Sequence, residues 1–376
     1  MNAPALKIID NLADIPAAQW DELAGNDPFL SHAYLYALQE SGCATAQFGW
    51  QAQFLTLWQG GQLLGAMPLY LKMNSYGEHV FDFAWADAYH RHGLRYYPKL
   101  VCTVPFTPVT GARLLAASTE IRALLLGSAL RLSTELGVSS LHCLFPDEAD
   151  TLLMQQQGMM LRQDVQFHWH NPGYRDFDAF LAEMSRDKRK HIKQERRRVK
   201  EAGVELQCVT GENATPDQWS FFAECYAHTR SQHNSPPALN ADFFQRIGAT
   251  MRKQTLLVIA NREGRPIASA LNIFTDDVLY GRSWGALEYH PGLHFETCYY
   301  QAIEFCIARK IKKFEGGAQG EHKLARGFMP VITRSAHWLA HPELSRAVEN
   351  YLQQETSAIS QYADELNERS PFKNHS

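Results

Sequence analysis

The sequence lacks the features that would place it outside the ordinary globular proteins. It has no run approaching about 20 apolar residues, so we expect no helix that spans a bilayer. Residues 1–4 lack the basic start that precedes the apolar core of a signal peptide. The net charge is only −4 over 376 residues, which gives no general reason to expect nucleic acid as a partner. We therefore predict a cytoplasmic protein without a transmembrane segment.

The chain also lacks the cysteine spacing of a disulfide framework or a structural zinc site. Its seven cysteines are scattered, and no two of them form a CxxC pair. An odd, dispersed set of this kind is typical of reduced thiols. Two His-x-His pairs, at residues 90–92 and 168–170, come without further ligands at a suitable spacing. We predict no metal and no tightly bound cofactor.

Length and composition indicate two soluble domains. The 376 residues are 45% hydrophobic and 20% charged, and such a length exceeds one ordinary core. Both halves follow one order of elements: helices, an antiparallel hairpin with a third strand, then a helix and a strand. We predict an α/β protein with mixed sheets and two domains, residues 1–172 and 173–376. The expected hairpins and third strands are 53–58 with 63–72, then 79–85, and 255–261 with 266–275, then 278–284.

The stretch from Gly281 to Trp338 holds the densest chemistry. A strand is expected to end at Trp284, a Gly/His/Pro loop to follow, and a helix to run over about 296–311. A short strand at 313–315 then leads into a segment rich in glycine and titratable residues. Permissive backbone beside titratable groups is common where chemistry occurs, although the glycines could also serve simple turns.

Candidate catalytic residues lie in both loops of this stretch. Amide-forming acyl transfer needs a base to accept the amine proton and donors for the oxyanion. Glu321 and His322 are candidates for that base, and so are His294 and Glu296 at the predicted helix start. Glu296 could instead stabilise the first helical turn. Tyr299 could contact substrate or simply belong to the core.

Two basic residues of the glycine-rich segment suit an anionic donor. Lys323 offers a point charge and Arg326 a planar fork, and both kinds of group bind phosphate. In the first half, a cluster of aromatic and charged residues suits substrate binding, although aromatic residues at this density are also ordinary core. The candidates there are Asp87, Tyr89, His90, Lys99 and Arg113.

A basic helix is expected to open the second half, at residues 185–202. It carries nine Lys or Arg residues against three acids, and its apolar positions thin to Ile192 and Val199. Few compensating pairs are expected at i,i+4 spacing. Crowding of like charge favours contact with an anion such as tRNA or another polyanion, whereas the alternative is a solvated helix.

Long strings in the sequence resemble a known family. The repeated order of elements resembles tandem GNAT-type acyltransferase domains, as in the Fem-type peptidoglycan aminoacyltransferases. The whole chain is more similar still to the bacterial Fem-like N-acyltransferases of the peptidoglycan biosynthesis/recognition family. The strings that carry the resemblance are at residues 81–89, 96–100, 105–111, 185–204, 293–301 and 314–328.

The resemblance implies an N-acyltransferase with acyl-CoA as co-substrate and an amine acceptor linked to peptidoglycan precursors. The alternatives are an aminoacyl-tRNA-dependent Fem-type transferase and a non-catalytic module that binds a peptidoglycan precursor or another anion. GNAT enzymes hold pyrophosphate in an Arg/Gln-x-x-Gly-x-Gly/Ala loop, which Arg282 and Gly285 match. Leu287 stands where that loop has a small residue, so this sequence departs from the standard coenzyme A-binding loop at that position.

Overall fold

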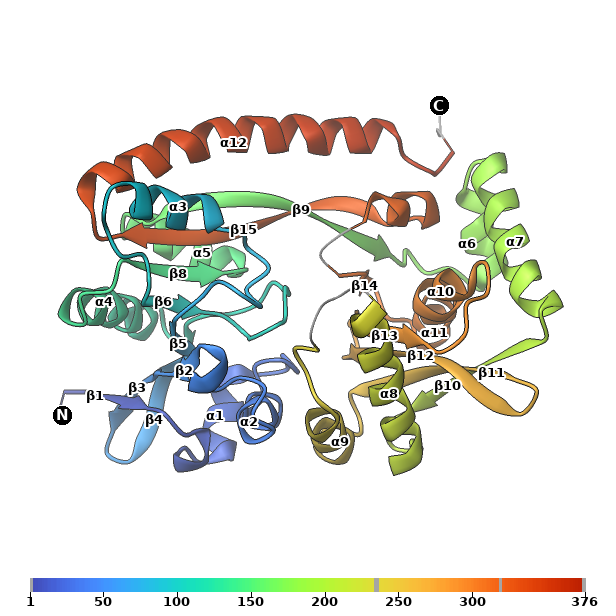
Figure 1. The fold of residues 1–376 in the computed structure, drawn as a ribbon, viewed down its shortest axis with the longest axis horizontal. Coiled ribbons are helices and arrows are strands. Elements are labelled where there is room, and N and C mark those ends of the chain that lie inside the picture. Colours follow the sequence, from blue (N-terminus) through green and yellow to red (C-terminus); the bar gives the residue numbers. More distant parts are fainter. Residues whose placement is uncertain (1–2, 233–236, 318–319, 374–376) are drawn as a thin grey trace. The chain divides into compact units, whose positions relative to one another are not determined.

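In a computed structural model, the chain forms two compact units, and residues 3–232, 237–317 and 320–373 are described. The first unit comprises residues 1–164 and 332–361, and the second comprises 165–331 and 362–376. Figure 1 traces the elements in chain order. The sequence analysis placed the boundary at 172/173 and assigned the whole C-terminal segment to the second domain. The structure instead assigns most of that segment to the first unit.

The first unit is a mixed α/β structure with two sheets. One sheet has the order β1-β3-β4-β7, and the other contains β15-β8-β6-β5-β2. The strands are β1 (Ala5–Ile9), β2 (Trp50–Ala52), β3 (Phe54–Gln59), β4 (Gln62–Met67), β5 (Leu69–Lys72), β6 (Lys99–Cys102), β7 (Leu115–Ala116), β8 (Ser140–Leu144) and β15 (Met329–Leu339). The helices are α1 (Ala17–Ala24), α2 (His32–Glu40), α3 (Phe83–Arg91), α4 (Thr119–Glu135), α5 (Glu148–Gln156) and α12 (Pro342–Glu368).

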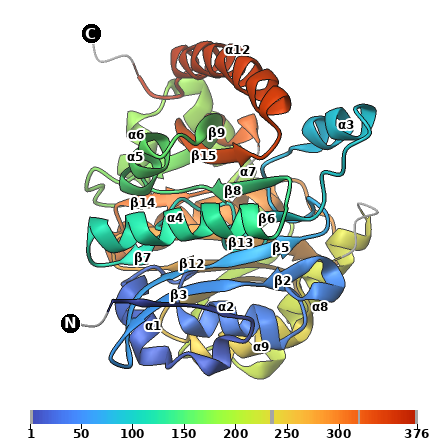
Figure 2. The ribbon, with the colours of Figure 1, turned by 90° about the vertical axis from the view of Figure 1, so that its left-hand side faces the viewer.

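Helix α4 covers one face of the first unit's strands (Figure 2). Its Leu125, Leu126 and Ala129 are buried against strand residues such as Leu100 and Leu141. The helix begins where the Ser118 hydroxyl accepts a hydrogen bond from the Ile121 amide, a role for which serine is a preferred residue.

The C-terminal segment belongs to the first unit because its apolar side chains are buried there. Strand β15 pairs antiparallel with β8, from Ser335↔Leu144 to Leu339↔Ser140. On α12, Leu344, Val348 and Leu352 pack in a cluster with Trp85 of α3. Burial of such side chains contributes about 1.5–3 kcal/mol each.

Two strand expectations in the first unit are wrong. The segment predicted as a strand at 79–85 ends in helix α3, because Trp85 and Tyr89, four residues apart, turn the same way into the α12 cluster. The strand predicted at 63–72 is two strands, β4 and β5, which join different sheets on either side of Pro68. A proline lacks the amide that would continue the ladder.

The second unit carries a six-stranded sheet of order β10-β11-β12-β13-β14-β9. Its strands are β9 (Met160–His170), β10 (Val204–Thr210), β11 (Thr255–Arg262), β12 (Arg265–Phe274), β13 (Val278–Ala286) and β14 (Lys313–Glu315). Its helices are α6 (Phe177–Glu183), α7 (Arg186–Glu201), α8 (Pro216–Gln232), α9 (Ala241–Thr250), α10 (Leu293–Phe295), a π-helical turn (Glu296–Tyr300), α11 (Gln301–Arg309) and a 3₁₀ helix (Glu321–Arg326). Two of the three unit boundaries fall inside strands, β9 and β15, and the third, at 361/362, falls inside α12.

Candidate functional site

The second unit contains a pocket of about 300 Å³ beside the edge of β13. Strands β13 and β14 run parallel, and their register ends at Tyr280↔Glu315. Strand β13 continues to Ala286, paired there with β12 alone of the described strands. The pocket lies along this extension. Its lining residues are Ala270, Leu271, Asn272, Gly281, Arg282, Ser283, Trp284, His294, Cys298, Tyr299, Phe314, Gly316, Gly317, His322 and Lys323.

The helix that follows β13 reaches the pocket through an irregular turn. Glu296–Tyr300 is π-helical, which shifts the side-chain directions between α10 and α11. Such turns occur mostly as single insertions and often at functional sites. Cys298 and Tyr299 of this turn line the pocket, whereas the buried Glu296 forms a 3.0 Å ion pair with Arg196 of α7. Glu296 therefore stabilises the packing of α7.

Two histidines and a tyrosine gather at one side of the pocket. The rings of His294 and His322 are 6.1 Å apart, and His322 Nε2 lies 3.2 Å from the Tyr299 hydroxyl. Burial and the neighbouring His322 lower the pKa of His294 to about 4, and partial burial with Lys323 lowers the pKa of His322. Burial raises the pKa of Tyr299. At neutral pH the site thus holds neutral imidazoles, which can accept a proton, beside a protonated phenol.

Lys323 contributes an ammonium group to the pocket. Its Nζ donates a 2.9 Å hydrogen bond to the Gly317 carbonyl. Burial lowers the pKa of Lys323 to about 8, so the ammonium form predominates at pH 7. The 3₁₀ helix turns this side chain inward, and Gly317 adopts a φ of +87° that favours glycine.

Asn272 of β12 adds an unsatisfied donor. Its side chain is buried and lines the pocket, and its Nδ2 atom has no hydrogen-bond partner in the described part of the chain. A buried amide without a partner costs about 1–3 kcal/mol, so such a group inside a pocket points to a ligand acceptor. The sequence analysis did not identify Asn272. In the sequence, Asn272 is one polar residue within an apolar hairpin strand. The pairing of β12 with β13 places it in the pocket.

Glu321 points away from this chemistry. It is exposed and accepts a 2.7 Å hydrogen bond from the Tyr362 hydroxyl, with Arg369 at 3.3 Å. These partners hold the pKa of Glu321 below its ordinary value. Glu321 does not line the pocket, whereas its neighbour His322 does.

Arg326 is committed to the protein interior. Its Nη2 lies 2.6 Å from Glu195 of α7, its Nη1 donates to the His322 carbonyl, and the guanidinium stacks 3.3 Å from the Phe295 ring centroid. A guanidinium held in this way fixes the 3₁₀ helix and hence the position of His322. Tyr300 also donates to Glu195, which completes the contact between the π-helical turn and α7.

The predicted pyrophosphate loop is part of a strand. Arg282 and Gly285 both belong to β13, where Gly285 pairs with Ser269. A Cβ on Gly285 would lie 2.0 Å from the Cys225 carbonyl of α8, so close packing explains this glycine. Arg282 lines the pocket. Gly292 begins α10 and packs against α7, where an added Cβ would lie 3.2 Å from the Glu195 carbonyl.

The candidates in the first unit do not form a single open site. Tyr89 is buried and donates to the Ser139 carbonyl, whereas Asp87 and His90 are exposed on α3. Arg113 is buried and donates to the carbonyls of Leu144 and Val109, both at 2.7 Å. These bonds give Arg113 a structural role.

Lys99 is buried in a network of polar groups that the sequence analysis largely missed. Its Nζ lies 2.8 Å from Glu78 and also donates to Asp82. Tyr96 links Asp82 to His142, whose Nδ1 lies 2.7 Å from Nδ1 of His337. Burial raises the pKa of Glu78 to about 7. The partners come from distant segments, and no local pattern could have assembled them.

The basic helix, predicted at 185–202, is α7. Ile192, Glu195 and Val199 form its buried side. Pairing is greater than the sequence analysis expected: Arg196 contacts Glu296 and Glu304, Lys193 contacts Asp178 at 3.2 Å, and Arg197 contacts Glu201 at 3.5 Å. The exposed bases of this helix are Arg186, Lys188, Lys190, Lys193, Arg197, Arg198 and Lys200.

Neither His-x-His pair belongs to a metal-binding cluster in the described residues, where no group of three suitable ligands was found. His168 is buried, and burial lowers its pKa to about 3. His90 and His92 are exposed on and just after α3. The described residues also include no helix that is long and apolar enough to cross a membrane.

Comparisons with known proteins agree on family and fold. The FemAB-like family model, described as peptidoglycan biosynthesis/recognition, matches residues 11–374. No curated protein matches the sequence. Among solved structures, FemX is similar with a TM-score of 0.54 and 10% identity, covering 89% of this chain and 98% of FemX.

Two further structures extend the comparison. L-PGS from Bacillus licheniformis has a TM-score of 0.50 and 9% identity, covering 87% of this chain and 97% of its own. A tandem GNAT protein from the clavulanic acid biosynthesis pathway has a TM-score of 0.45 and 12% identity, covering 90% of this chain and 99% of its own. The predicted fold class, α/β with mixed sheets, is confirmed, and FemX shares the fold.

Proposed function

The chain belongs to the FemAB-like family of peptidoglycan biosynthesis and recognition, and from this premise we propose that its second unit is an N-acyltransferase. Family and fold support a transferase. The observation that carries the proposal is the pocket beside β13, where a buried unsatisfied amide, two neutral imidazoles and an ammonium group line one cavity. These are the donors and the base that amide formation requires.

The roles follow from the chemistry of each group. The acceptor amine attacks the acyl carbonyl of an activated donor, and the imidazole of His322 accepts the amine proton. Asn272 Nδ2 and the Lys323 ammonium donate to the oxyanion of the tetrahedral intermediate. The imidazolium, or the Tyr299 phenol beside it, returns a proton as the leaving group departs. Collapse of the intermediate then gives the amide.

We take acyl-CoA as the first candidate donor. Its pantetheine arm is slender and contains amides, and an edge of β-strand binds such groups through main-chain hydrogen bonds. The edge of β13 beyond Tyr280 and the adjoining pocket offer that environment. Arg282 lines the same pocket and can meet the anionic part of the donor.

Calorimetric titration of acetyl-CoA tests this donor. We expect saturable binding by the unmodified protein and weaker binding by Arg282→Ala. Asn272→Asp keeps the side-chain shape and removes the amide donor, so it should lower turnover by about 10²–10³-fold with little change in the melting temperature. If the unmodified protein binds no acetyl-CoA at millimolar concentration, the acyl-CoA donor is excluded.

A second candidate, an aminoacyl-tRNA donor, is supported by α7. The helix start that commonly holds phosphate in such folds, at Gly292, packs against α7, whose outer face is basic. The polyanionic part of a donor would then meet the exposed bases of α7. The acceptor, in either case, is an amine carried by a peptidoglycan precursor.

Salt dependence distinguishes this candidate. RNA affinity should fall steeply with salt, and the combined change Lys190→Glu, Lys193→Glu and Arg197→Glu should reduce the slope of log K against log salt by about 2. The exposed bases Arg91 and Arg95 of the first unit, changed to Glu, serve as the control. Equal RNA retention by both variants would make α7 a solvated helix.

A further inference from the structure

The first unit exposes three aromatic rings on one short segment. Tyr76 is 72% exposed, Phe81 58% and Phe83 42%. The Phe81 and Phe83 rings stack at 6.1 Å with an interplanar angle of 23°, and Phe83 lies 6.2 Å from Tyr76. We call this set the aromatic platform. Contiguous exposed apolar surface of this kind marks an interaction site more often than scattered exposed residues do.

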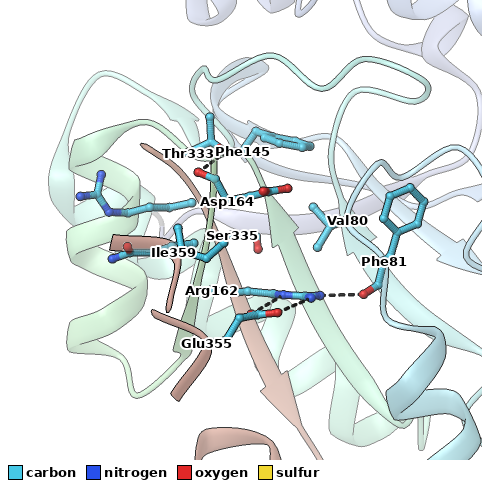
Figure 3. A pocket seen from close by; sticks show the side chains of 11 residues that line it. Val80, Phe81, Phe145, Arg162, Asp164, Thr333, Ser335, Glu355 and Ile359 are labelled. Carbon is cyan, nitrogen blue, oxygen red and sulfur yellow. Dashed lines mark hydrogen bonds and ion pairs between the residues drawn. The ribbon is translucent and has the colours of Figure 1, made fainter. Parts of the chain in front are cut away.

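A polar pocket of about 90 Å³ adjoins the aromatic platform. Phe81 belongs to both (Figure 3). The polar lining comes from β9, β15 and α12, in stretches that lie in the first unit. Its polar members are Arg162, Gln163, Asp164, Thr333, Arg334, Ser335 and Glu355.

Arg162 fixes the platform to the pocket. Its Nε and Nη2 each donate a 2.8 Å hydrogen bond to Glu355, and its Nη1 donates a 2.7 Å bond to the Phe81 carbonyl (Figure 3). Because both ends of this contact are held before any ligand arrives, binding would order few groups. Preorganisation of this kind favours affinity.

The charges of the lining balance. Arg162 and Arg334 are matched by Asp164 and Glu355, and Arg162 is already paired with Glu355. A lining without net charge gives no attraction to a phosphate or an anionic membrane surface. It suits a neutral ligand that has many hydroxyl groups.

We propose that the aromatic platform and this pocket form a binding site for a neutral saccharide. A pyranose ring presents an apolar face of C–H groups, which lies flat on an aromatic ring, and an equatorial rim of hydroxyls. Phe81 and Phe83 supply the rings. Gln163, Thr333 and Ser335 supply uncharged partners for the hydroxyls, and Ser335 is backed by His337 Nε2 at 2.8 Å, so its hydroxyl has a second partner in place.

An uncharged amino sugar such as N-acetylglucosamine fits this chemistry, because its amide and hydroxyls match the lining without adding charge. The site is in the first unit and stands apart from the transferase pocket in the residues that form it. The proposal therefore does not depend on the reaction assigned to the second unit.

Direct binding of a soluble N-acetylglucosamine oligosaccharide to the full chain, by calorimetry, tests the proposal. We expect saturable binding that Phe81→Ala and Phe83→Ala each weaken by about two- to tenfold, the range for loss of one aromatic contact. Gln163→Leu should weaken it as well. Leu152→Ala removes an equally exposed apolar side chain (56%) outside the lining, and should leave affinity unchanged.

Two results would overturn the proposal. One is the absence of saturable binding at millimolar oligosaccharide by a folded protein. The other is binding of the protein to vesicles of anionic phospholipid, lost in Phe81→Ala, by a protein that binds no oligosaccharide. That result would make the aromatic platform a membrane contact. Acetyl-CoA binding is measured on the same preparation and tests the second unit independently. A protein that binds acetyl-CoA but no oligosaccharide would contradict the saccharide site alone.

Discussion

At the scale of single residues, the pocket of the second unit combines groups whose protonation states differ at neutral pH. His294 and His322 are neutral bases, and Lys323 is an acid that still holds its proton. Their side chains converge because α10 supplies His294 and the 3₁₀ helix supplies His322 and Lys323 to the same pocket. The pairing of a proton acceptor with a cation is what separates this pocket from ordinary packing.

The pH dependence of turnover follows from these groups. The imidazole base works only when deprotonated, so kcat/KM should fall as pH drops through a pKa below 6.5. The Lys323 ammonium works only when protonated, so activity should also fall as pH rises through about 8. The expected profile is a bell. In Lys323→Arg the alkaline limb should disappear, and an unchanged limb would contradict the role of Lys323.

His322 and Glu321 are adjacent in sequence but differ in their contacts, so their variants should differ. His322→Gln removes the base and should lower kcat by about 10²–10⁴-fold with a melting temperature near that of the unmodified protein. Glu321→Gln alters an exposed side chain held by Tyr362 and should leave kcat nearly unchanged. Steady-state kinetics of the two variants give the comparison. An equal loss of kcat in both variants would make Glu321 a candidate for the catalytic base again.

The candidate residues were predictable from the sequence to different degrees. His294, His322, Lys323, Arg282 and Tyr299 were found because titratable groups and glycines cluster within one stretch, and the structure places all five in one pocket. Glu296 and Arg326 were found for the same reason, yet they pair with residues of α7 that lie 100 and 131 positions earlier. Which charges face a ligand and which face a distant helix is decided by tertiary packing, which a local pattern does not contain.

At the scale of elements, β13 and its neighbours explain the form of the pocket. Strands β13 and β14 pair over only three residues of each strand, from Val278↔Lys313 to Tyr280↔Glu315. Beyond Tyr280, β13 continues with β12 on one side, and its other edge borders the pocket. The β11–β12 hairpin could be predicted, because the expected strands at 255–261 and 266–275 match β11 and β12 within a residue at each end. Helix α3 could not be predicted, because the alternation of Phe81, Phe83 and Trp85 is typical of a strand. The helix is stabilised by the packing of Trp85 against α12, which the local sequence does not show.

Gly285 tests the packing of β13 against α8. Gly285→Ala places a Cβ 2.0 Å from the Cys225 carbonyl, so the free energy of unfolding should fall by about 1–3 kcal/mol. Gly127→Ala, in the interior of α4 with nothing within 4 Å, should instead stabilise by about 0.5–1 kcal/mol. Denaturant unfolding measures both. A stable Gly285→Ala variant that has lost donor affinity would favour the phosphate-binding role predicted from the sequence.

At the scale of the whole molecule, the two units repeat an order of elements but differ at corresponding positions. In the first unit, the parallel register of β6 and β8 ends at Cys102↔Cys143. The chain from Thr103 then returns as a bridge between Gly111 and Pro146, with the Arg113 guanidinium bonded to the Leu144 carbonyl. The first unit thus fills with its own backbone the position that is open beside β13.

This asymmetry predicts one donor molecule per chain. Calorimetry of the full chain with acetyl-CoA should give a stoichiometry near one, abolished by Ser283→Trp, which fills the pocket in the second unit. Arg113→Ala should lower stability, because it leaves buried carbonyls without a donor, and should not create a second site. A stoichiometry of two would mean that the first unit also takes donor.

Detection of the amide product tests the central claim most directly. The full chain is incubated with a peptidoglycan precursor that bears a free amine, together with acetyl-CoA or an aminoacyl-tRNA, and the precursor is analysed by mass spectrometry. If the second unit catalyses amide formation, the mass of the precursor should increase by one acyl group with one of the donors. The rate of product formation should be at least about 10²-fold lower in His322→Gln. A precursor of unchanged mass with both donors, or a product formed equally by His322→Gln, would contradict the account.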